Sequence, residues 1–187
     1  MTFNFSEFKN KKIIVTGSST GIGFETGVEF LNLGANVIFH GNQSINDLEA
    51  RIKTKSQSKN FKLFKSDFTD LSQVDNFMND AINYLDGLDI LVNNAGTMVG
   101  RYQLDSISEK DFLKIFDLNA KSAYFATKSA CTIFKKQNYG NIINVSTISA
   151  RTGGSAGSSV YAASKAFVSA ITRSVSYTHL TLPTKQM

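Results

Sequence analysis

The sequence predicts an α/β fold with a doubly wound parallel sheet, and three observations support this prediction. Short runs of β-branched residues alternate along the chain with longer segments whose apolar residues recur at helical spacing. The strand-like runs are apolar on both faces, as in a sheet that helices cover on both sides. Strand, helix and strand in alternation imply right-handed crossovers and a parallel sheet. The 187 residues suffice for one domain with its own core.

The expected strands are short apolar runs bounded by glycine or polar residues. In order they are Lys12–Thr16, Asn36–His40, Phe61–Lys65, Leu88–Val92 and Asn141–Val145.

The expected helices lie between and after these strands. Ile22, Phe30 and Leu33 recur at helical spacing, and Gly34 is a suitable residue to end that helix. A polar surface helix is expected from about 44 to 58. One later helix carries Ala123, Ala126, Ala130 and Phe134 on one face, and another begins near Val160.

The helix after the third strand has the clearest pattern. Asp70 can cap it, and Gln73, three residues later, is a capping-box partner. Its apolar face comprises Leu71, Val74, Phe77, Met78, Ala81, Ile82 and Leu85. Ser108 can cap the next helix, in which we expect Phe112, Ile115 and Phe116 to face inward.

Composition and charge argue against several classes of protein. The net charge is +5, but lysines are interleaved with acids, so we expect no nucleic-acid partner. No apolar run approaches the roughly 20 residues of a membrane span, and the first residues lack the features of a secretory signal. A single cysteine, Cys131, rules out a disulfide framework and favours a reducing compartment. We therefore expect a cytoplasmic protein that does not contact a membrane.

The loop between the first strand and the first helix is rich in glycine and hydroxyl residues. Glycines let a backbone approach a pyrophosphate closely, and a helix N-terminus offers free N–H groups to phosphates. The loop alone is also compatible with a simple turn. The residues expected to bind a dinucleotide are Gly17, Ser18, Ser19, Thr20, Gly21, Ile22 and Gly23.

Two further motifs indicate the same site. The string Asn93-Asn94-Ala95-Gly96 follows the fourth strand, beside the point where a doubly wound sheet reverses its strand order. Its small residues leave room for a flat cofactor, which we expect Asn93, Ala95 and Gly96 to contact. Tyr161 and Lys165 are four residues apart on one helix face. A nearby ammonium favours the phenolate, which makes Tyr161 a suitable general acid/base.

The three motifs, TGxxxGIG, NNAG and YxxxK, resemble those of classical short-chain dehydrogenases/reductases, from about Lys11 to Ser174. The resemblance implies a Rossmann fold and hydride transfer between NAD or NADP and a small-molecule carbonyl or alcohol, without a metal. It also implies that Tyr161 is the acid/base and that Lys165 binds the nicotinamide ribose. Substrates of the 3-oxoacyl-[acyl-carrier-protein] reductase type and sugars or polyols both remain open. A cofactor-binding sensor without turnover is the alternative function.

The resemblance assigns further roles. Asn119 would hold a water next to Lys165, and Asp67 with its neighbour Phe68 would contact the adenine side of the cofactor. The family's catalytic serine falls on Thr147, which keeps a hydroxyl, and Ser146 is the second candidate.

The residues after the second strand bear on the choice of cofactor. No acid precedes Asp47 there, whereas NAD enzymes use an acid at this place to bind the ribose 2′-OH. This favours NADP, with Ser18, His40 and Asn42 as candidate phosphate partners.

The end of the chain departs from the pattern. The string 175–184 resembles a translated sequencing adapter and contains the only proline, Pro183. The family continues with two more strands and a substrate-covering segment. We therefore expect residues 1–174 to be a Rossmann domain truncated before its last strands, and 175–187 to be an artefactual tail. The complete protein is expected to be a homo-oligomer, through helix faces near 123–134 and 161–173.

Overall fold

Parallel pairing places the strands in the order β3-β2-β1-β4-β5 in the computed structural model, which describes residues 5–42, 45 and 47–178. The strand bounds are β1 Lys12–Val15, β2 Asn36–Gly41, β3 Phe61–Lys65, β4 Ile90–Asn93 and β5 Asn141–Asn144. In register, Ile14 of β1 pairs with Ile38 of β2 and with Leu91 of β4. The predicted doubly wound sheet is confirmed, and each strand lies within two residues of its expected bounds.

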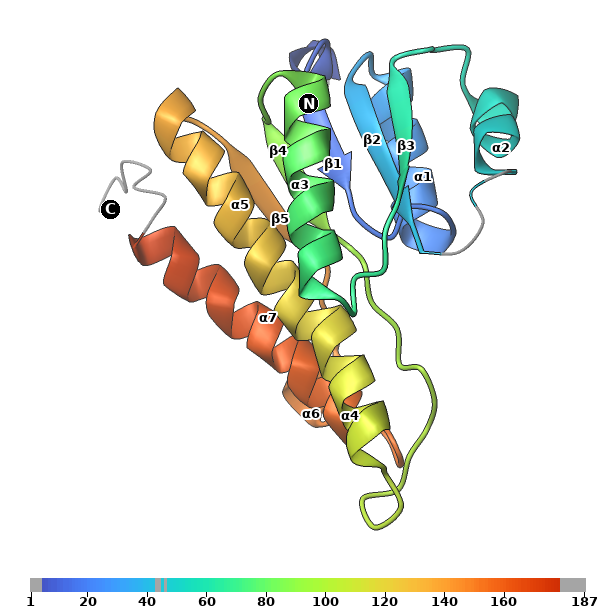
Figure 1. Cartoon of the computed structure of the whole chain (residues 1–187), viewed down its shortest axis with the longest axis vertical. Helices are drawn as coiled ribbons and strands as arrows, with labels where there is room; N and C mark the ends of the chain where they lie inside the picture. Colours follow the sequence, from blue (N-terminus) through green and yellow to red (C-terminus); the bar gives the residue numbers. More distant parts are fainter. Residues whose placement is uncertain (1–4, 43–44, 46, 179–187) are drawn as a thin grey trace.

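Helices cover both faces of this sheet (Figure 1). Their bounds are η1 Phe5–Phe8, α1 Gly21–Asn32, α2 Leu48–Lys55, α3 Leu71–Leu85, α4 Glu109–Phe116, η2 Asp117–Lys121, α5 Ser122–Gln137, α6 Ser149–Thr152 and α7 Ser159–Thr178. Ile14 and Leu91 pack with residues of α3 and α5, whereas Val15 and Phe39 pack with residues of α1 and α2. Because side chains alternate along a strand, the strands β1 to β4 contribute to both apolar layers, whereas β5 contributes Ile142 to one layer and leaves Ile143 44% exposed on its other face.

The apolar face of α1 differs from the expected one. Phe24, Val28 and Leu31 are its buried apolar residues, whereas Ile22 is 71% exposed. Two residues correspond to about 200° around a helix, so Ile22 and Phe24 cannot share a face. Ile22 therefore lies on the open side of α1, at the carboxyl ends of the strands.

The inward face of α4 is also narrower than expected. Ile115 is buried and Phe116 is half-buried, but Phe112 is 43% exposed, so its expected burial is wrong. Phe112 stacks on Phe116, whose ring centroid lies 5.8 Å from that of Phe167 in α7. The aromatic face of α4 thus continues over α7 instead of entering the core.

The expected helix caps are largely confirmed. Asp70 accepts a hydrogen bond of 2.9 Å from Ser72 N–H, and Ser108 accepts one of 3.1 Å from Asp111 N–H. Gln73 differs, because its Oε1 accepts the N–H of Asp67 at 2.8 Å. In a capping box the Gln73 side chain would accept the N–H of the cap residue, Asp70. Here it accepts the N–H of a residue three positions earlier, and it thereby fixes the chain between β3 and α3.

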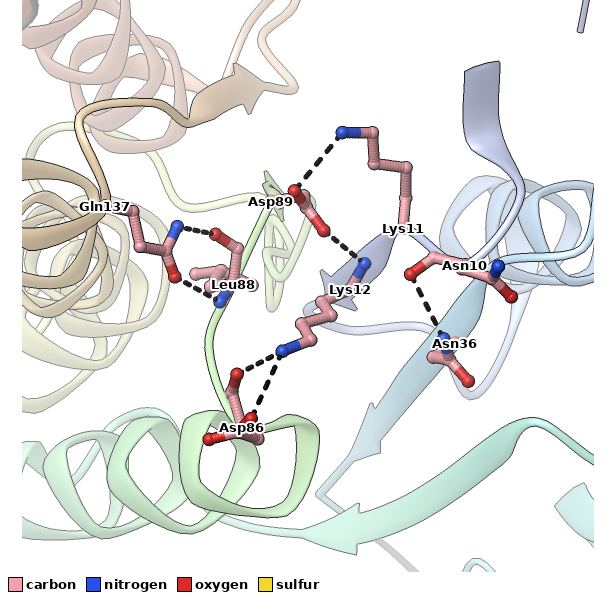
Figure 2. Close-up of polar contacts among 8 residues, drawn as sticks. All are labelled: Asn10, Lys11, Lys12, Asn36, Asp86, Leu88, Asp89 and Gln137. Atoms are coloured by element: carbon pink, nitrogen blue, oxygen red, sulfur yellow. Dashed lines mark hydrogen bonds and ion pairs between the residues drawn. The ribbon is translucent and has the colours of Figure 1, made fainter. Parts of the chain in front are cut away.

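Polar side chains join the amino ends of the strands to the segments around them (Figure 2). Asp89 accepts the N–H of Lys12 at 2.7 Å and is 3.4 Å from Lys11 Nζ. The amide of Gln137, at the end of α5, donates to Leu88 O at 2.7 Å and accepts Leu88 N–H at 3.1 Å. These contacts satisfy buried main-chain groups at the end of the sheet that lies opposite the glycine-rich loop.

The last described helix runs past the expected domain boundary. α7 extends to Thr178, so residues 175–178 continue it, and residues 179–187 of the expected tail lie outside the described residues. The boundary at 174 remains a prediction. None of the helices within the described ranges combines the length and apolarity of a membrane span.

Candidate functional site

The strand order reverses between β1 and β4, and a crevice is expected beyond the carboxyl ends of these strands. Two loops meet there in close contact. A Cβ built on Gly17, whose φ is +62°, would lie 2.6 Å from the Cα of Ala95, and one built on Gly23 would lie 2.3 Å from Asn94 Nδ2. Only glycine allows this approach, so both glycines bring the predicted dinucleotide loop against the Asn93–Gly96 segment.

The N-terminus of α1 fits a pyrophosphate. Its cap residue, Thr20, makes no side-chain hydrogen bond to the helix, and the first turn has no acidic residue. Gly21, with φ +59°, has nothing within 4 Å of a built Cβ, so this side of the loop is open. N–H groups of a first turn without a side-chain acceptor suit an anion.

Thr16 and Asn94 hold the two loops together. Thr16 Oγ1 accepts N–H bonds of 3.0 Å from Asn94 and from Ala95, and the Asn94 amide donates to Thr16 O at 3.0 Å and Gly17 O at 2.9 Å. Neither side chain has a role in the motifs predicted from the sequence. The available signal was a polar residue at the end of each of two neighbouring strands.

The side chain of Asn93 does not face the dinucleotide loop. Its Nδ2 donates to Thr127 Oγ1 at 2.9 Å and to Asn144 Oδ1 at 2.8 Å. These bonds tie the end of β4 to α5 and β5. The Asn93 side chain thus positions elements of the fold, and its predicted cofactor contact stays a prediction.

His40 and Ser18 are also engaged inside the protein. His40 is 2% exposed; its Nδ1 accepts Gly17 N–H at 2.9 Å, and its Nε2 lies 3.0 Å from Ser66 O. Ser18 Oγ donates to Val15 O at 2.6 Å and accepts His40 N–H at 2.8 Å. These polar atoms already have partners that shape the loop, and the assignment of either residue to a 2′-phosphate stays a prediction.

Burial lowers the pKa of His40 from 6.5 to about 4, although the bond to Ser66 and the charge of Asp67 oppose this shift. The imidazole is therefore neutral near pH 7. An Nδ1 that accepts from Gly17 leaves the ring proton on Nε2, which donates to Ser66 O.

The residues expected at the adenine side behave differently from one another. Asp67 is half-buried, and its Oδ1 accepts hydrogen bonds of 2.9 and 2.8 Å from the N–H and hydroxyl of Thr69. Phe68 is 1% exposed, and its ring stacks on His40 at 3.9 Å between centroids. The Phe68 side chain thus belongs to the core and offers no surface to a ligand. Asn42 is exposed at the end of β2.

Lys165 and Asn119 meet around Gly96. A Cβ built on Gly96 would lie 3.0 Å from Lys165 Nζ and 2.4 Å from Asn119 Oδ1. Lys165 is buried, donates to Val145 O at 3.0 Å, and has its pKa lowered by that burial. Asn119 is fully buried in the π-helical turn η2, and its amide pairs with both Thr97 N–H and Thr97 O at 2.8 Å. The predicted lysine and asparagine are therefore brought together.

Tyr161 lies one turn before Lys165 on α7 and is half-buried. Among the described residues, its hydroxyl has no hydrogen-bond partner. Ser146 faces α7, where its Oγ lies 2.9 Å from Ser169 Oγ and donates to Lys165 O at 3.3 Å. Thr147 Oγ1 accepts Ser149 N–H at 3.3 Å, which leaves its own proton available to a ligand. The contacts therefore favour Thr147 over Ser146 as the hydroxyl donor.

One basic residue beside the loop was not singled out from the sequence. Arg51, on α2, donates from Nη1 to Ser19 O at 2.9 Å, and its guanidinium carbon lies 4.5 Å from the ring centroid of Phe24. The two partners lie 32 and 27 residues away along the chain, so no local motif marks this contact.

Over residues 5–42, 45 and 47–178, no group of three or more His, Cys, Asp or Glu side chains could hold a metal ion.

Known proteins share this sequence pattern and fold. A family model described as "short chain dehydrogenase" matches residues 11–181. The "Hydroxynaphthalene reductase-like protein Arp2" of Metarhizium guizhouense is 31% identical over 168 residues, which cover 88% of this chain and 61% of that protein. The "Probable NADP-dependent mannitol dehydrogenase" of Yarrowia lipolytica is 32% identical over 142 residues, covering 75% of this chain and 51% of that protein.

A solved structure of a reductase has a similar fold. The crystal structure of the NADH-dependent reductase A1-R′ complexed with NAD superposes with a TM-score of 0.85 at 31% sequence identity, covering 93% of this chain and 75% of that one. The chain thus spans 61% of the length of the Metarhizium relative and three quarters of this structural neighbour.

Proposed function

The chain belongs to the short-chain dehydrogenase family, and we propose that the protein is an oxidoreductase that uses NAD or NADP to interconvert a carbonyl and an alcohol. The meeting of Lys165, Asn119 and Gly96 beside the glycine-rich loop carries this proposal. The buried Lys165 ammonium thus lies beside a loop that suits a pyrophosphate, and Tyr161 is one helical turn from Lys165.

The first-turn N–H groups of α1 bind the pyrophosphate, and Gly21 leaves that side of the loop open. Lys165 binds the nicotinamide ribose, and Asp67 contacts the adenine side. When bound, the nicotinamide supplies or accepts a hydride. Ile22, exposed at the mouth of the crevice, limits the access of water to the bound cofactor.

Proton transfer falls to Tyr161. In the reductive direction its hydroxyl donates a proton to the substrate oxygen, and the Lys165 ammonium stabilises the phenolate that remains. Thr147 donates a hydrogen bond to the same oxygen and orients the carbonyl. Asn119 holds the Thr97 backbone in place, and with Lys165 it lies on the route by which Tyr161 recovers its proton.

The substrate is proposed only as a carbonyl or alcohol. One relative is named for a hydroxynaphthalene reductase and another for a mannitol dehydrogenase, so the relatives span unlike substrates. A 3-oxoacyl-[acyl-carrier-protein] substrate remains a prediction.

The test replaces Tyr161 by Phe in the complete product of the gene that encodes this chain. We expect kcat for NAD(P)H-dependent carbonyl reduction to fall by about 10²- to 10⁴-fold, while NAD(P)H affinity, followed by cofactor fluorescence, is unchanged. The matched control is Tyr84→Phe, which changes an exposed tyrosine on α3 and should preserve kcat. Cofactor binding by the wild type with no turnover on any carbonyl or alcohol tested would favour a sensor over an enzyme.

We also propose that the protein is a homo-oligomer through the aromatic face of α4, α5 and α7. Phe112 and Tyr124 are 43% and 44% exposed there, and the rings of Phe116 and Phe167 connect them. Large aromatic side chains of this kind are enriched at protein interfaces. Sedimentation equilibrium showing only monomers at micromolar concentration would refute this proposal.

A further inference from the structure

We propose that Arg51 selects NADP over NAD by binding the 2′-phosphate of the adenosine, an inference that rests on the proposed dinucleotide site. The residue comes from α2, apart from both the glycine-rich loop and the end of β2. Arg51 would thus supply the phosphate contact for which Ser18, His40 and Asn42 were the predicted candidates.

Three segments meet where Arg51 lies. A Cβ built on Gly41, the last residue of β2, would lie 2.9 Å from Ser19 Cβ, so the glycine-rich loop abuts the end of β2. Arg51 reaches the same loop from α2, through the 2.9 Å bond from Nη1 to Ser19 O. Its guanidinium also lies over the ring of Phe24 in α1. The side chain is therefore held beside the end of β2.

The end of β2 has no carboxylate. It consists of buried His40, Gly41 and exposed Asn42. In dinucleotide-binding folds an acid near this place binds the 2′-OH of NAD, whereas a nearby arginine accommodates the 2′-phosphate of NADP. The chain has the arginine in contact with the loop and lacks the acid on the strand.

Arg51 also differs from the other cations of its helix. Lys53 lies 2.6 Å from Glu49, and Lys55 lies 2.6 Å from Glu25, so each has a close carboxylate. The only carboxylate within 4.0 Å of the Arg51 guanidinium among the described residues is that of Asp47, at 3.9 Å. This pair is solvated, since the Asp47 side chain is 73% exposed, and such pairs are weak.

The guanidinium has donors to offer a ligand. It carries five N–H groups in a planar fork, and both polar contacts described for Arg51 use Nη1. Its side chain is 40% exposed, so a phosphate can reach it. Charge-assisted bonds between such a fork and a phosphate are stronger than neutral hydrogen bonds.

The test compares 2′,5′-ADP with 5′-AMP, which lacks the 2′-phosphate, by isothermal titration calorimetry. We expect the wild type to bind 2′,5′-ADP more tightly than 5′-AMP. Arg51→Gln should weaken 2′,5′-ADP by about 10- to 100-fold and leave 5′-AMP unchanged. Arg51→Lys should give an intermediate loss, because it keeps the charge but not the fork. Lys53→Gln, which removes a cation from the same helix, is the matched control and should change neither affinity.

Two results would overturn the assignment while the proposed function stands: equal binding of both nucleotides by the wild type, or an equal loss for both in Arg51→Gln. The second would mean that Arg51 only supports the loop through Ser19. If circular dichroism shows that Arg51→Gln does not fold, the ratio of the two affinities in Arg51→Lys decides, and an unchanged ratio overturns the assignment. A folded wild type that binds neither nucleotide nor NAD(P)H would refute the proposed function as well.

Discussion

Protonation of His40 should destabilise the glycine-rich loop, because the imidazole accepts a hydrogen bond from Gly17 N–H. The second proton can only go to Nδ1, the nitrogen that faces this N–H, since Nε2 donates to Ser66 O. A protonated ring would point one donor at another in a buried place. The bond that holds the first glycine of the loop would then be lost.

The size of the effect follows from the change in pKa. Burial lowers the pKa of His40 from 6.5 to about 4, so between these values the unfolded chain binds the proton more tightly than the folded protein. The contribution of His40 to the free energy of unfolding is complete above pH 6.5 and declines as the pH falls toward 4. The full loss is about 3 kcal/mol, most of which falls between pH 7.0 and 4.5.

Two measurements check this value. Urea unfolding at pH 7.0 and pH 4.5 gives the loss for the wild type and for His40→Asn, which keeps an oxygen acceptor near Gly17 but does not titrate. The wild type should lose about 2 kcal/mol more than the variant. The chain has two histidines, so NMR follows two imidazole signals, and His179→Gln identifies the signal of His40.

A His40 signal that titrates near pH 6.5 would refute the reasoning, because it would mean that burial does not oppose the charge. An equal loss of stability in the wild type and in His40→Asn would refute it in a different way. Acid sensitivity would then arise from carboxylates elsewhere in the protein.

Three other predictions test the contacts described above. Gly17→Ala should lower the free energy of unfolding by at least about 3 kcal/mol and abolish NAD(P)H binding, because it combines a φ of +62° with a Cβ 2.6 Å from Ala95 Cα; unchanged urea unfolding and cofactor fluorescence would contradict this. Asp89→Ala should cost about 2 to 3 kcal/mol by leaving Lys12 N–H without its acceptor, whereas Asp86→Asn, at an exposed position, should cost less than about 0.5 kcal/mol; equal costs in thermal unfolding would show that burial at Asp89 is unimportant. Thr147→Val should lower kcat by about 100-fold or more while Thr147→Ser preserves it, and a larger loss in Ser146→Ala than in Thr147→Val would reverse their order.

Much of the fold could be predicted because its signals are local. A β-branched run such as 13–15 and a seven-residue apolar face such as that of α3 leave few alternatives. The exposed side chains of Ile22 and Phe112 are exceptions, because their spacing predicted buried faces. Helical spacing groups residues on a face, but it does not say whether the core, a crevice or another molecule covers that face.

The site residues could be predicted where they form a short motif in the sequence. They could not where the contacting residues are far apart along the chain. The glycine-rich loop, Tyr161 and Lys165 stand in short strings whose geometry follows from one turn or one helix. Arg51 contacts residues more than 25 positions away, and His40 contacts Gly17 and Ser66 from two other segments. Whether a polar side chain at the end of a strand faces a ligand or its own loop depends on three-dimensional packing that the linear pattern does not encode.

The clamps formed by Asp89 and Gln137 have a consequence for motion (Figure 2). They anchor main-chain amides at one end of the strands, whereas the opposite end is held by loops rich in glycine. Hydrogen–deuterium exchange should therefore be slower at Lys12 and Leu88 than along 19–23, so that local opening is easier at one end of the sheet than at the other. The loops at the carboxyl ends of the strands can then change conformation for different ligands while the amino ends of the strands stay in place.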